Sequence, residues 1–238
     1  MSSLMLMDLS NGLIVSCQAH GEHPLRDPGI IAALAQCAEF GGAVGIRADG
    51  PEDVAEIKRL VTLPVIGIYK LALSKERFFI TPTLDHARKL TEAGADIVAL
   101  EATFENRPDD RELGRLVERI HTELGVPVMA DVSVFEEGVR AWEVGADLVA
   151  TTLSGHTRAS KGAEKPDLQL VERLAGTSIR VVTEGHIRSP QQVASAFEVG
   201  AFAVVVGTAI TDPVAVTSWF VEAAREQSRS PSRKGAQW

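Results

Sequence analysis

Glu92-Ala-Gly-Ala-Asp96 recurs along the chain as Glu143-Val-Gly-Ala-Asp147 and again as Glu198-Val-Gly-Ala-Phe202. Phe40-Gly-Gly-Ala-Val44 is a looser copy of the same pattern. Each copy closes an amphipathic stretch with a glycine, the residue that commonly ends a helix in the left-handed conformation. A short run rich in Val and Ile follows, without strict polar alternation, as expected of a parallel strand buried on both faces. The repeat therefore predicts alternating helices and parallel strands.

Eight such apolar runs occur in the 238 residues, which gives about 30 residues per strand-plus-helix unit. Eight alternating units close into a (β/α)8 barrel, for which about 250 residues is typical. The predicted strands are 13–18, 43–47, 64–70, 96–103, 127–133, 148–155, 179–185 and 203–208. The predicted helices are 28–40, 51–61, 83–93, 110–124, 135–144, 166–175, 190–199 and 213–226. We expect one barrel domain over residues 1–226 and a flexible polar tail over residues 227–238.

An open doubly wound sheet is the competing fold. It would normally carry a Gly-rich first turn, and no Gly-x-Gly-x-x-Gly occurs in the chain. The internal repeat and the count of eight units favour the (β/α)8 barrel.

Composition bounds the class of protein. The chain carries 24 Lys and Arg against 32 Asp and Glu, a net charge of −8, with 45% hydrophobic residues. This balance excludes a disordered chain and argues against a nucleic-acid partner, because phosphate backbones need clustered basic residues. Two cysteines are too few for a disulfide framework, so we expect a cytoplasmic protein. The apolar N-terminus lacks the positive region of a secretory signal, and no stretch is long enough to span a membrane.

Polar side chains end several of the predicted strands. In a (β/α)8 barrel, the carboxyl ends of the strands form the active site. One charged residue at a strand end often marks only the point where the chain meets water, so the convergence of several is the informative observation. The six residues that we expect at this mouth are Gln18, Arg47, Lys70, Glu101, Asp131 and Glu184.

Glycines end the last two predicted strands. Gly185 follows Glu184, and Gly207 precedes Thr208. Many barrels bind phosphate at this pair of strands through backbone N–H groups and the N-terminus of a short helix. We therefore predict phosphate binding by Gly185, Gly207 and Thr208, with ordinary turn glycines as the alternative.

Lys70 and Glu184 are the candidate acid–base pair. A lysine of ordinary pKa is only about 0.04% neutral at pH 7, so Lys70 can act as a base only if its pKa falls. Burial near Arg47 would lower it, and Lys70 could then remove a proton beside a carbonyl or form a Schiff base. Metal chemistry has little support, because His20 and His23 lie in a loop without a carboxylate at ligand spacing.

Several motifs together resemble the N-acetylmannosamine-6-phosphate 2-epimerases over about residues 12–222. The matching stretches are Ile14-Val-Ser-Cys-Gln18, Gly41-Gly-Ala-Val-Gly-Ile-Arg47-Ala48, Pro64-Val-Ile-Gly-Ile-Tyr-Lys70, Phe79-Ile-Thr-Pro-Thr83, Met129-Ala-Asp131, Thr151-Thr-Leu-Ser-Gly155, Glu184-Gly185 and Val204-Val-Val-Gly207. Each piece is common among phosphate-binding barrels, but the joint set is specific.

The resemblance implies inversion at C2 of N-acetylmannosamine 6-phosphate, giving N-acetylglucosamine 6-phosphate, in sialic-acid catabolism. It implies no metal or redox cofactor. Lys70 matches the family's catalytic lysine, which takes and returns the C2 proton, and Glu184 matches the glutamate that assists. Gln18, Arg47 and Asp131 match positions that contact the substrate.

The chain departs from the family pattern at three positions. Members have Arg where this chain has Asp212, Asp where it has Glu101, and Arg where it has His186. An acidic residue beside a phosphate opposes its binding by charge. Arg188 and Arg158 are the cations that could compensate for the change at Asp212.

Two other functions are compatible with these residues. One is a Schiff-base aldolase or lyase acting on a sugar phosphate, and the other is a barrel that binds a sugar phosphate without turnover. Barrels of this kind often form dimers, so a homodimer is one expected assembly, although no sequence feature fixes the oligomeric state.

Overall fold

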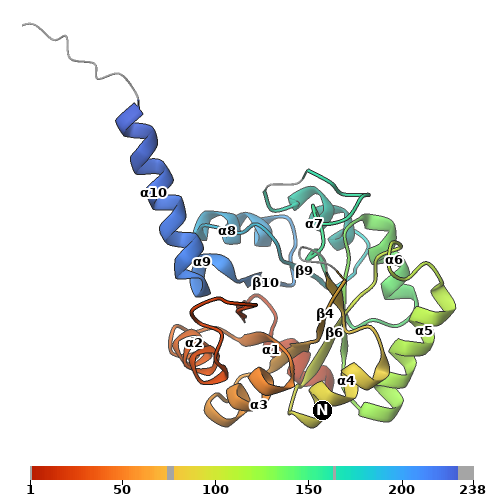
Figure 1. Ribbon diagram of the computed structural model, residues 1–238. Helices are drawn as coiled ribbons and strands as arrows, with labels where there is room; N and C mark the ends of the chain where they lie inside the picture. The colour runs from red at the N-terminus through yellow and green to blue at the C-terminus, as the bar shows by residue number, and fades with distance from the viewer. Residues whose placement is uncertain (1, 74–77, 163–164, 230–238) are drawn as a thin grey trace, which may run out of the picture.

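Eight parallel strands close into a barrel in the computed structural model, which describes residues 2–73, 78–162 and 165–229 (Figure 1). The ring runs β1-β10-β9-β8-β7-β6-β3-β2, and each neighbouring pair is parallel. The predicted (β/α)8 barrel is confirmed. The barrel strands are β1 (Leu13–Cys17), β2 (Gly45–Asp49), β3 (Val65–Ile68), β6 (Ile97–Glu101), β7 (Val128–Asp131), β8 (Leu148–Ala150), β9 (Val181–Thr183) and β10 (Ala203–Val206).

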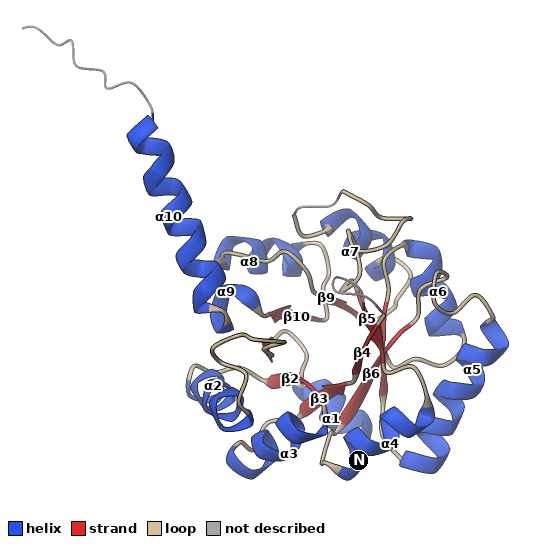
Figure 2. Ribbon diagram, viewed as in Figure 1, coloured by secondary structure: helices blue, strands red, loops and turns tan. Residues whose placement is uncertain are grey.

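Helices surround the barrel between successive strands (Figure 2). Local signals set their starts: the Asp27 side chain accepts a hydrogen bond from the Ile30 N–H, and Pro28 occupies the first turn of α2. The surrounding helices are α2 (Pro28–Phe40), α3 (Pro51–Leu60), α4 (Leu84–Glu92), α5 (Asp110–Arg119), α6 (Phe135–Glu143), α7 (Leu168–Ala175) and α8 (Pro190–Glu198). A π-helical turn, Ile120–Leu124, extends α5.

The core has two layers. Side chains on one face of each strand pack against the helices, and side chains on the other face fill the barrel interior. Both faces are therefore apolar, which explains why the strands read as continuous apolar runs. Ile66, Ile97, Met129 and Val205 are among the residues that fill the interior.

The N-terminal segment closes the barrel at its amino-terminal end. α1 (Ser2–Asp8) was not expected from the sequence. Leu6 and Leu9 are buried and join the cluster inside the barrel, and the Asn11 N–H donates to the Phe202 carbonyl just before β10. The apolar start of the chain therefore serves as an internal plug.

The prediction that the third strand runs over residues 64–70 was wrong at its end. β3 stops at Ile68, and Lys70 begins β4 (Lys70–Ala72), which pairs antiparallel with β5 (Phe78–Ile80) outside the barrel. The second strand was also ended too early, because β2 continues two residues past Arg47 to Asp49. The Lys70 N–H donates to Asp49 Oδ1 at 2.9 Å, so this carboxylate draws the chain away from the barrel ladder.

The last unit leaves the ring of helices. After β10, the short α9 (Thr208–Thr211) leads into α10 (Pro213–Arg229), which projects away from the barrel (Figure 1). The predicted helix 213–226 therefore extends three residues further, into the segment expected to be a flexible tail. Residues 230–238 lie outside the described residues.

Candidate active site

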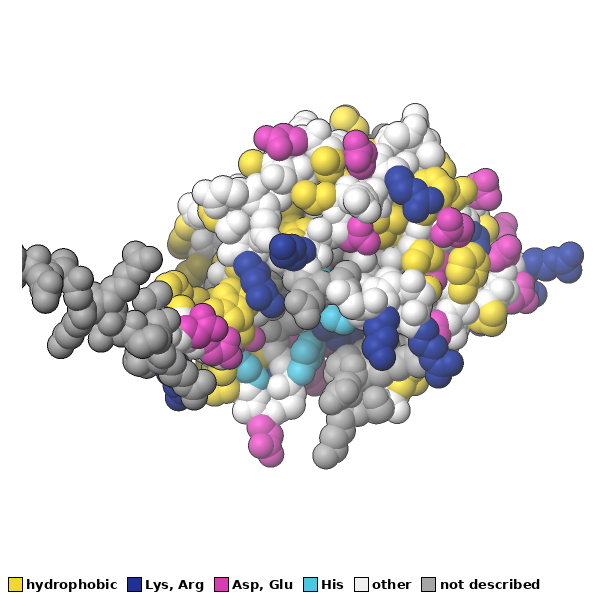
Figure 3. All heavy atoms as spheres, turned by 90° about the horizontal axis from the view of Figure 1, so that it is seen from above, with side chains coloured by type: hydrophobic (Ala, Val, Ile, Leu, Met, Phe, Trp, Pro, Cys, Tyr) yellow, Lys and Arg dark blue, Asp and Glu magenta, His cyan; other side chains and the backbone are white. Residues whose placement is uncertain are grey.

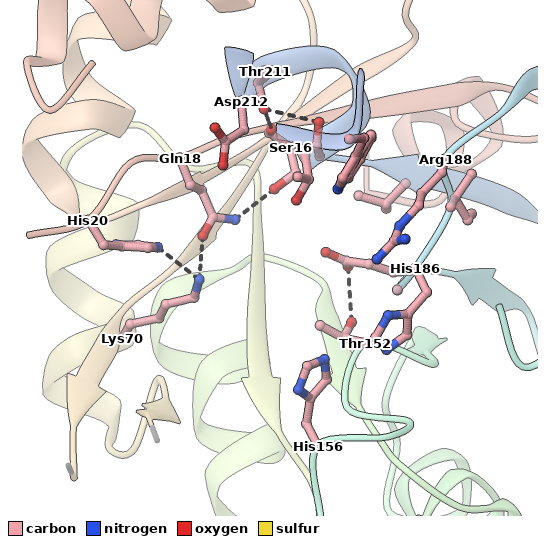
Figure 4. Close-up of a pocket in the computed structure, with 17 residues that line it drawn as sticks. Ser16, Gln18, His20, Lys70, Thr152, His156, His186, Arg188, Thr211 and Asp212 are labelled. Atoms are coloured by element: carbon pink, nitrogen blue, oxygen red, sulfur yellow. Dashed lines mark hydrogen bonds between the residues drawn. The ribbon is translucent and has the colours of Figure 1, made fainter. Parts of the chain in front are cut away.

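A cavity of about 440 Å³ opens at the carboxyl ends of β1, β8, β9 and β10. Figure 4 shows its lining side chains, and Figure 3 shows histidine side chains gathered on one face of the molecule. Six of the predicted site residues line this cavity: Gln18, Lys70, Glu184, Gly185, Gly207 and Thr208. Arg47, Asp131 and Glu101 do not.

Arg47 and Asp131 form a buried ion pair behind Glu184. Arg47 Nη1 and Nη2 donate to Asp131 Oδ1 and Oδ2 at 3.0 and 2.6 Å, and Nη1 lies 2.9 Å from Glu184 Oε2. The Arg47 and Asp131 side chains are 1% and 0% exposed. Burial alone would lower the pKa of Arg47, but the two carboxylates outweigh burial and raise it. The guanidinium therefore stays charged and fixes the Glu184 carboxylate.

Thr152 is a site residue that strand-end reasoning missed. Its Oγ1 lies 2.7 Å from Asp131 Oδ1 and 3.0 Å from Glu184 Oε2, and it can donate to one of them at a time. Thr151 holds the backbone, because its Oγ1 donates to the Glu184 carbonyl and accepts from the Glu184 N–H. The signal for Thr152 in the sequence is the Thr151-Thr-Leu-Ser-Gly155 motif, which directly follows β8.

Lys70 reaches the cavity from the β4 hairpin rather than from a barrel strand. Its Nζ donates to Gln18 Oε1 at 2.6 Å and lies 3.0 Å from His20 Nε2 (Figure 4). Gln18 is itself held, because its Nε2 donates to Ser16 Oγ at 2.7 Å. The sequence therefore predicted the lysine correctly as a cavity residue but not the element that carries it.

The environments of Lys70 and Glu184 shift their pKa values in opposite directions. Burial lowers the pKa of Lys70, with Arg47 acting in the same direction and Asp49 opposing it. Burial raises the pKa of Glu184, and Arg47 opposes that rise. A lysine that loses its proton more easily and a glutamate that holds its proton more tightly are suited to acid–base chemistry near neutral pH.

Glu101 lies at the end of β6, as expected, but its carboxylate is engaged elsewhere. It is 3% exposed, and its Oε1 accepts from Thr103 Oγ1 at 2.5 Å and from Asn106 Nδ2 at 2.8 Å. Burial raises its pKa. Substrate contact by Glu101 stays a prediction.

The predicted phosphate end lies where β9 and β10 finish. Gly185 has φ of +107°, a conformation that side chains rarely adopt. A Cβ on Gly207 would lie 3.3 Å from Ser16 Cβ, so glycine lets the two backbones approach. Thr208 opens α9 directly after Gly207. Gly185 is therefore favoured by its backbone conformation, and Gly207 by the close approach of Ser16.

Arg188 is the cation beside this end of the cavity. It lines the cavity, and its guanidinium carbon lies 4.8 Å from the ring centroid of Trp219, another lining residue. Asp212 also lines the cavity, with its Oδ1 accepting from the Ala215 N–H and lying 3.3 Å from His23 Nε2. Of the two arginines that could compensate for the charge of Asp212, Arg188 lines the cavity. Arg158 is 92% exposed and pairs with Glu105 instead.

Two further histidines line the cavity. The rings of His156 and His186 stack with centroids 5.3 Å apart, and burial followed by the neighbouring His186 lowers the pKa of His156. His186 has φ of +58°, and its Nε2 is buried without a hydrogen-bond partner within the described part of the chain. That nitrogen can serve a bound ligand.

Within residues 2–73, 78–162 and 165–229, no group of three or more His, Cys, Asp and Glu side chains could hold a metal ion. Over the same residues, no helix is both long and apolar enough to cross a membrane.

The fold and the cavity together define a (β/α)8-barrel enzyme of the acid–base type. The chain belongs to the N-acetylmannosamine-6-phosphate 2-epimerase family, as its resemblance predicted. The family model described as "Putative N-acetylmannosamine-6-phosphate epimerase" matches residues 31–226.

Relatives from several bacteria resemble the whole chain. The "Putative N-acetylmannosamine-6-phosphate 2-epimerase" of Caldanaerobacter subterraneus subsp. tengcongensis is 46% identical, covering 96% of this chain and 98% of that protein. The one from Cutibacterium acnes is 44% identical, covering 93% and 97%. The solved structure of N-acetylmannosamine-6-phosphate 2-epimerase from Clostridium perfringens has 39% identity and a TM-score of 0.85, covering 92% and 96%. A thiamine phosphate pyrophosphorylase from Pyrococcus furiosus, at 16% identity and TM-score 0.59, shares the fold alone.

Proposed function

We propose that this enzyme interconverts N-acetylmannosamine 6-phosphate and N-acetylglucosamine 6-phosphate, as a step in the catabolism of amino sugars such as sialic acid. The observation that carries the proposal is the pairing of Lys70 and Glu184 in one cavity, with the pKa of the lysine lowered and that of the glutamate raised. The identity of the sugar follows from the family to which the chain belongs.

The chemistry follows from the opened sugar. Its C1 carbonyl acidifies the proton on C2, and the neutral amine of Lys70 takes that proton while the electron pair forms an enolate. Return of a proton to the opposite face of C2 completes the inversion. Glu184 assists, either by protonating that face or by hydrogen bonding to the enolate oxygen. No cofactor is needed for this sequence of steps.

The residues around Lys70 and Glu184 have different roles in this proposal. Gln18 contacts the substrate from the cavity wall and holds Lys70 Nζ. Arg47 and Asp131, which lie behind Glu184, fix its carboxylate. Direct substrate contact by Arg47 and Asp131 remains the expectation from the resemblance.

The phosphate binds, in this proposal, between Gly185 and the start of α9 at Gly207 and Thr208. Arg188 supplies the positive charge, and its stacking on Trp219 keeps it at the cavity. Asp212 is turned to His23 and to the first turn of α10, which reduces its repulsion of an anion.

The test is incubation with N-acetylmannosamine 6-phosphate in D2O, followed by proton NMR. Deuterium at C2 together with the gluco epimer is the expected result, and Lys70→Ala is expected to abolish both while circular dichroism shows a folded protein. Lys58→Ala is the matched control, because Lys58 pairs with Asp96 away from the cavity. An absence of deuterium exchange at high wild-type enzyme concentration would refute the proposal. Activity in Lys70→Ala would show that Lys70 is not the base that removes the C2 proton.

The same samples separate the two alternatives. Borohydride reduction that links the sugar covalently to Lys70 would indicate Schiff-base chemistry, whereas the epimerase leaves no adduct. Saturable binding without exchange would indicate a non-catalytic barrel.

We also propose that the enzyme is a homodimer. α10 leaves the ring of helices and exposes Val214, Phe220 and Val221 by 55%, 73% and 40% (Figure 1). A second copy that covers these exposed apolar side chains would remove them from water. Light scattering should give twice the chain mass for the wild type and a smaller mass for Phe220→Asp. A monomeric wild type would refute this assembly.

We further propose that the enzyme is cytoplasmic. The free thiols of Cys17 and Cys37 support this location, because disulfides are rare in reducing compartments.

A further inference from the structure

His20 lies against the lysine that the proposed reaction depends on. It belongs to the loop that follows β1, yet its Nε2 is 3.0 Å from Lys70 Nζ, fifty residues away in sequence (Figure 4). Its ring also lines the cavity. His20 does not end a strand, and no step of the proposed reaction described above uses it.

Asp49 fixes the other side of the same ring. Asp49 Oδ2 lies 3.4 Å from His20 Nδ1, and Asp49 Oδ1 accepts a hydrogen bond from the Lys70 N–H at 2.9 Å. A carboxylate beside Nδ1 favours a proton on that nitrogen and leaves Nε2 as an acceptor directed at Lys70 Nζ. The Asp49 carboxylate, the His20 imidazole and the Lys70 amine therefore lie in the order of a proton relay. The contact between Asp49 and His20, at 3.4 Å, is the longer of the two.

The surroundings of the ring keep it unprotonated, with Nε2 able to accept a hydrogen bond. Burial and then the positive charge of Lys70 lower the pKa of His20, and Asp49 acts in the opposite direction. Arg26 and His23, from the same loop, add smaller effects that also lower it. His20 is therefore neutral at neutral pH, and only a neutral imidazole can take a proton from Lys70.

Gln18, which also contacts Lys70 Nζ in the cavity, cannot carry its proton. Gln18 Oε1 accepts a hydrogen bond from Nζ, but an amide oxygen is far too weak a base to remove the proton. The His20 side chain is 39% exposed, so its ring also reaches solvent. The imidazole therefore offers a route for the proton from the half-buried Lys70 amine to water.

We propose that His20, held by Asp49, is a positioning residue that aims the Lys70 amine and carries its proton to and from solvent. The inference rests on the proposed function, in which the C2–H bond breaks and its proton forms Lys70–NH3+. His20 Nε2 takes one proton from this ammonium, which restores the neutral amine, and the imidazolium then gives one proton to water. The reverse transfers supply a proton to Lys70 when C2 must be protonated.

The experiment compares His20→Gln and His20→Ala with the wild-type enzyme in initial-rate epimerisation of N-acetylmannosamine 6-phosphate. Glutamine keeps a polar side chain but cannot carry a proton. We expect kcat of His20→Gln to fall by about a hundredfold, the lower end of general acid–base effects, with KM within about twofold of wild type. Added imidazole should restore kcat of His20→Ala, because it supplies the missing proton carrier.

His121→Gln is the matched control. His121 Nε2 lies 2.8 Å from Asp147 Oδ2, so it is also a histidine paired with an aspartate, but it does not line the cavity. We expect its kcat and KM to match the wild type. Circular dichroism at each variant's assay temperature confirms folding, which a partly exposed side chain such as His20 does not endanger.

Two results would overturn the inference alone while the wild type is active. One is a kcat of His20→Gln within about twofold of wild type, whatever its KM. The other is a lowered kcat in His20→Ala that imidazole does not restore. A wild-type enzyme without epimerase activity would overturn the proposed function, and this inference with it.

Discussion

Replacement of Arg47 by methionine tests the ion network at the centre of the site. Arg47 is 1% exposed and contacts Asp131 at 2.6 and 3.0 Å and Glu184 at 2.9 Å. Methionine fills much of the same volume but leaves the Asp131 carboxylate, 0% exposed, and the Glu184 carboxylate, 14% exposed, without their cation. The expected consequence is a large loss of folding free energy, because buried carboxylates are then uncompensated.

The size of that loss follows from the burial. Removing one partner of a buried ion pair typically costs about 3–5 kcal/mol, out of a total of about 5–15 kcal/mol for a folded domain. At about 2–4 °C per kcal/mol for a chain of this size, Tm should fall by about 6–20 °C. Arg59→Met is the control, because Arg59 pairs with Glu56 at the surface, where its side chain is 64% exposed, and its Tm should hardly change.

The loss of folding free energy in Arg47→Met should also depend on pH. Burial already raises the pKa of Glu184 above its ordinary value, and loss of Arg47 removes an influence that lowers it. A carboxyl group with a folded-state pKa above its unfolded value contributes stability below the unfolded pKa and loses it as pH rises through the folded pKa. The deficit of Arg47→Met should therefore be smaller near about pH 5 than near about pH 8.

The assay is urea unfolding of wild type, Arg47→Met, Asp131→Asn and the double variant. The double variant should be more stable than the sum of the single losses predicts, by about 1–3 kcal/mol, because it lacks the unpaired Asp131 charge. Additive losses, or an Arg47→Met midpoint close to that of the surface control, would refute the reasoning.

Two further predictions concern packing and thiol chemistry. Gly67→Ala should destabilise by about 1–3 kcal/mol, because its Cβ would lie 2.8 Å from Ala95 Cβ. Gly114→Ala in α5 should stabilise by about 0.5–1 kcal/mol, because its Cβ has only ordinary contacts; urea midpoints that move in the same direction would contradict this pair. Burial raises the pKa of Cys17 to about 12, whereas Cys37 is exposed, so a disulfide reagent at pH 8 should titrate one thiol in the native protein and two in denaturant. Two rapid native thiols would show that Cys17 is accessible.

Most of the barrel could be predicted from the sequence because its signals are local. α2 begins and ends at the predicted residues, since Asp27, Pro28 and Gly41 mark both ends within one helix. Other helix boundaries differ by one to three residues. The start of α7 is among them, although the Asp167 side chain caps it. The α1 plug escaped prediction because its few apolar residues acquire a role only inside a closed barrel.

The candidate site was predicted in part. Lys70 and Glu184 line one cavity, as their positions after apolar runs suggested. Arg47 and Asp131 instead turn toward each other, because a buried guanidinium and a buried carboxylate each require a partner. Thr152 carries no charge and so was not singled out, although its hydroxyl lies within hydrogen-bonding distance of both acidic side chains.

Local patterns were enough to predict the fold, since helix and strand periodicity depend on near neighbours and repeat through the chain. The motifs at the strand ends were enough to predict the family. Which distant side chains meet depends on the folded barrel. Arg47 and Asp131 are 84 residues apart, and His20 and Lys70 are 50 apart. Their contacts depend on closure of the barrel and on the early exit of the chain after Ile68, which no local pattern encodes. The residues available for proton transfer are therefore a property of the closed barrel.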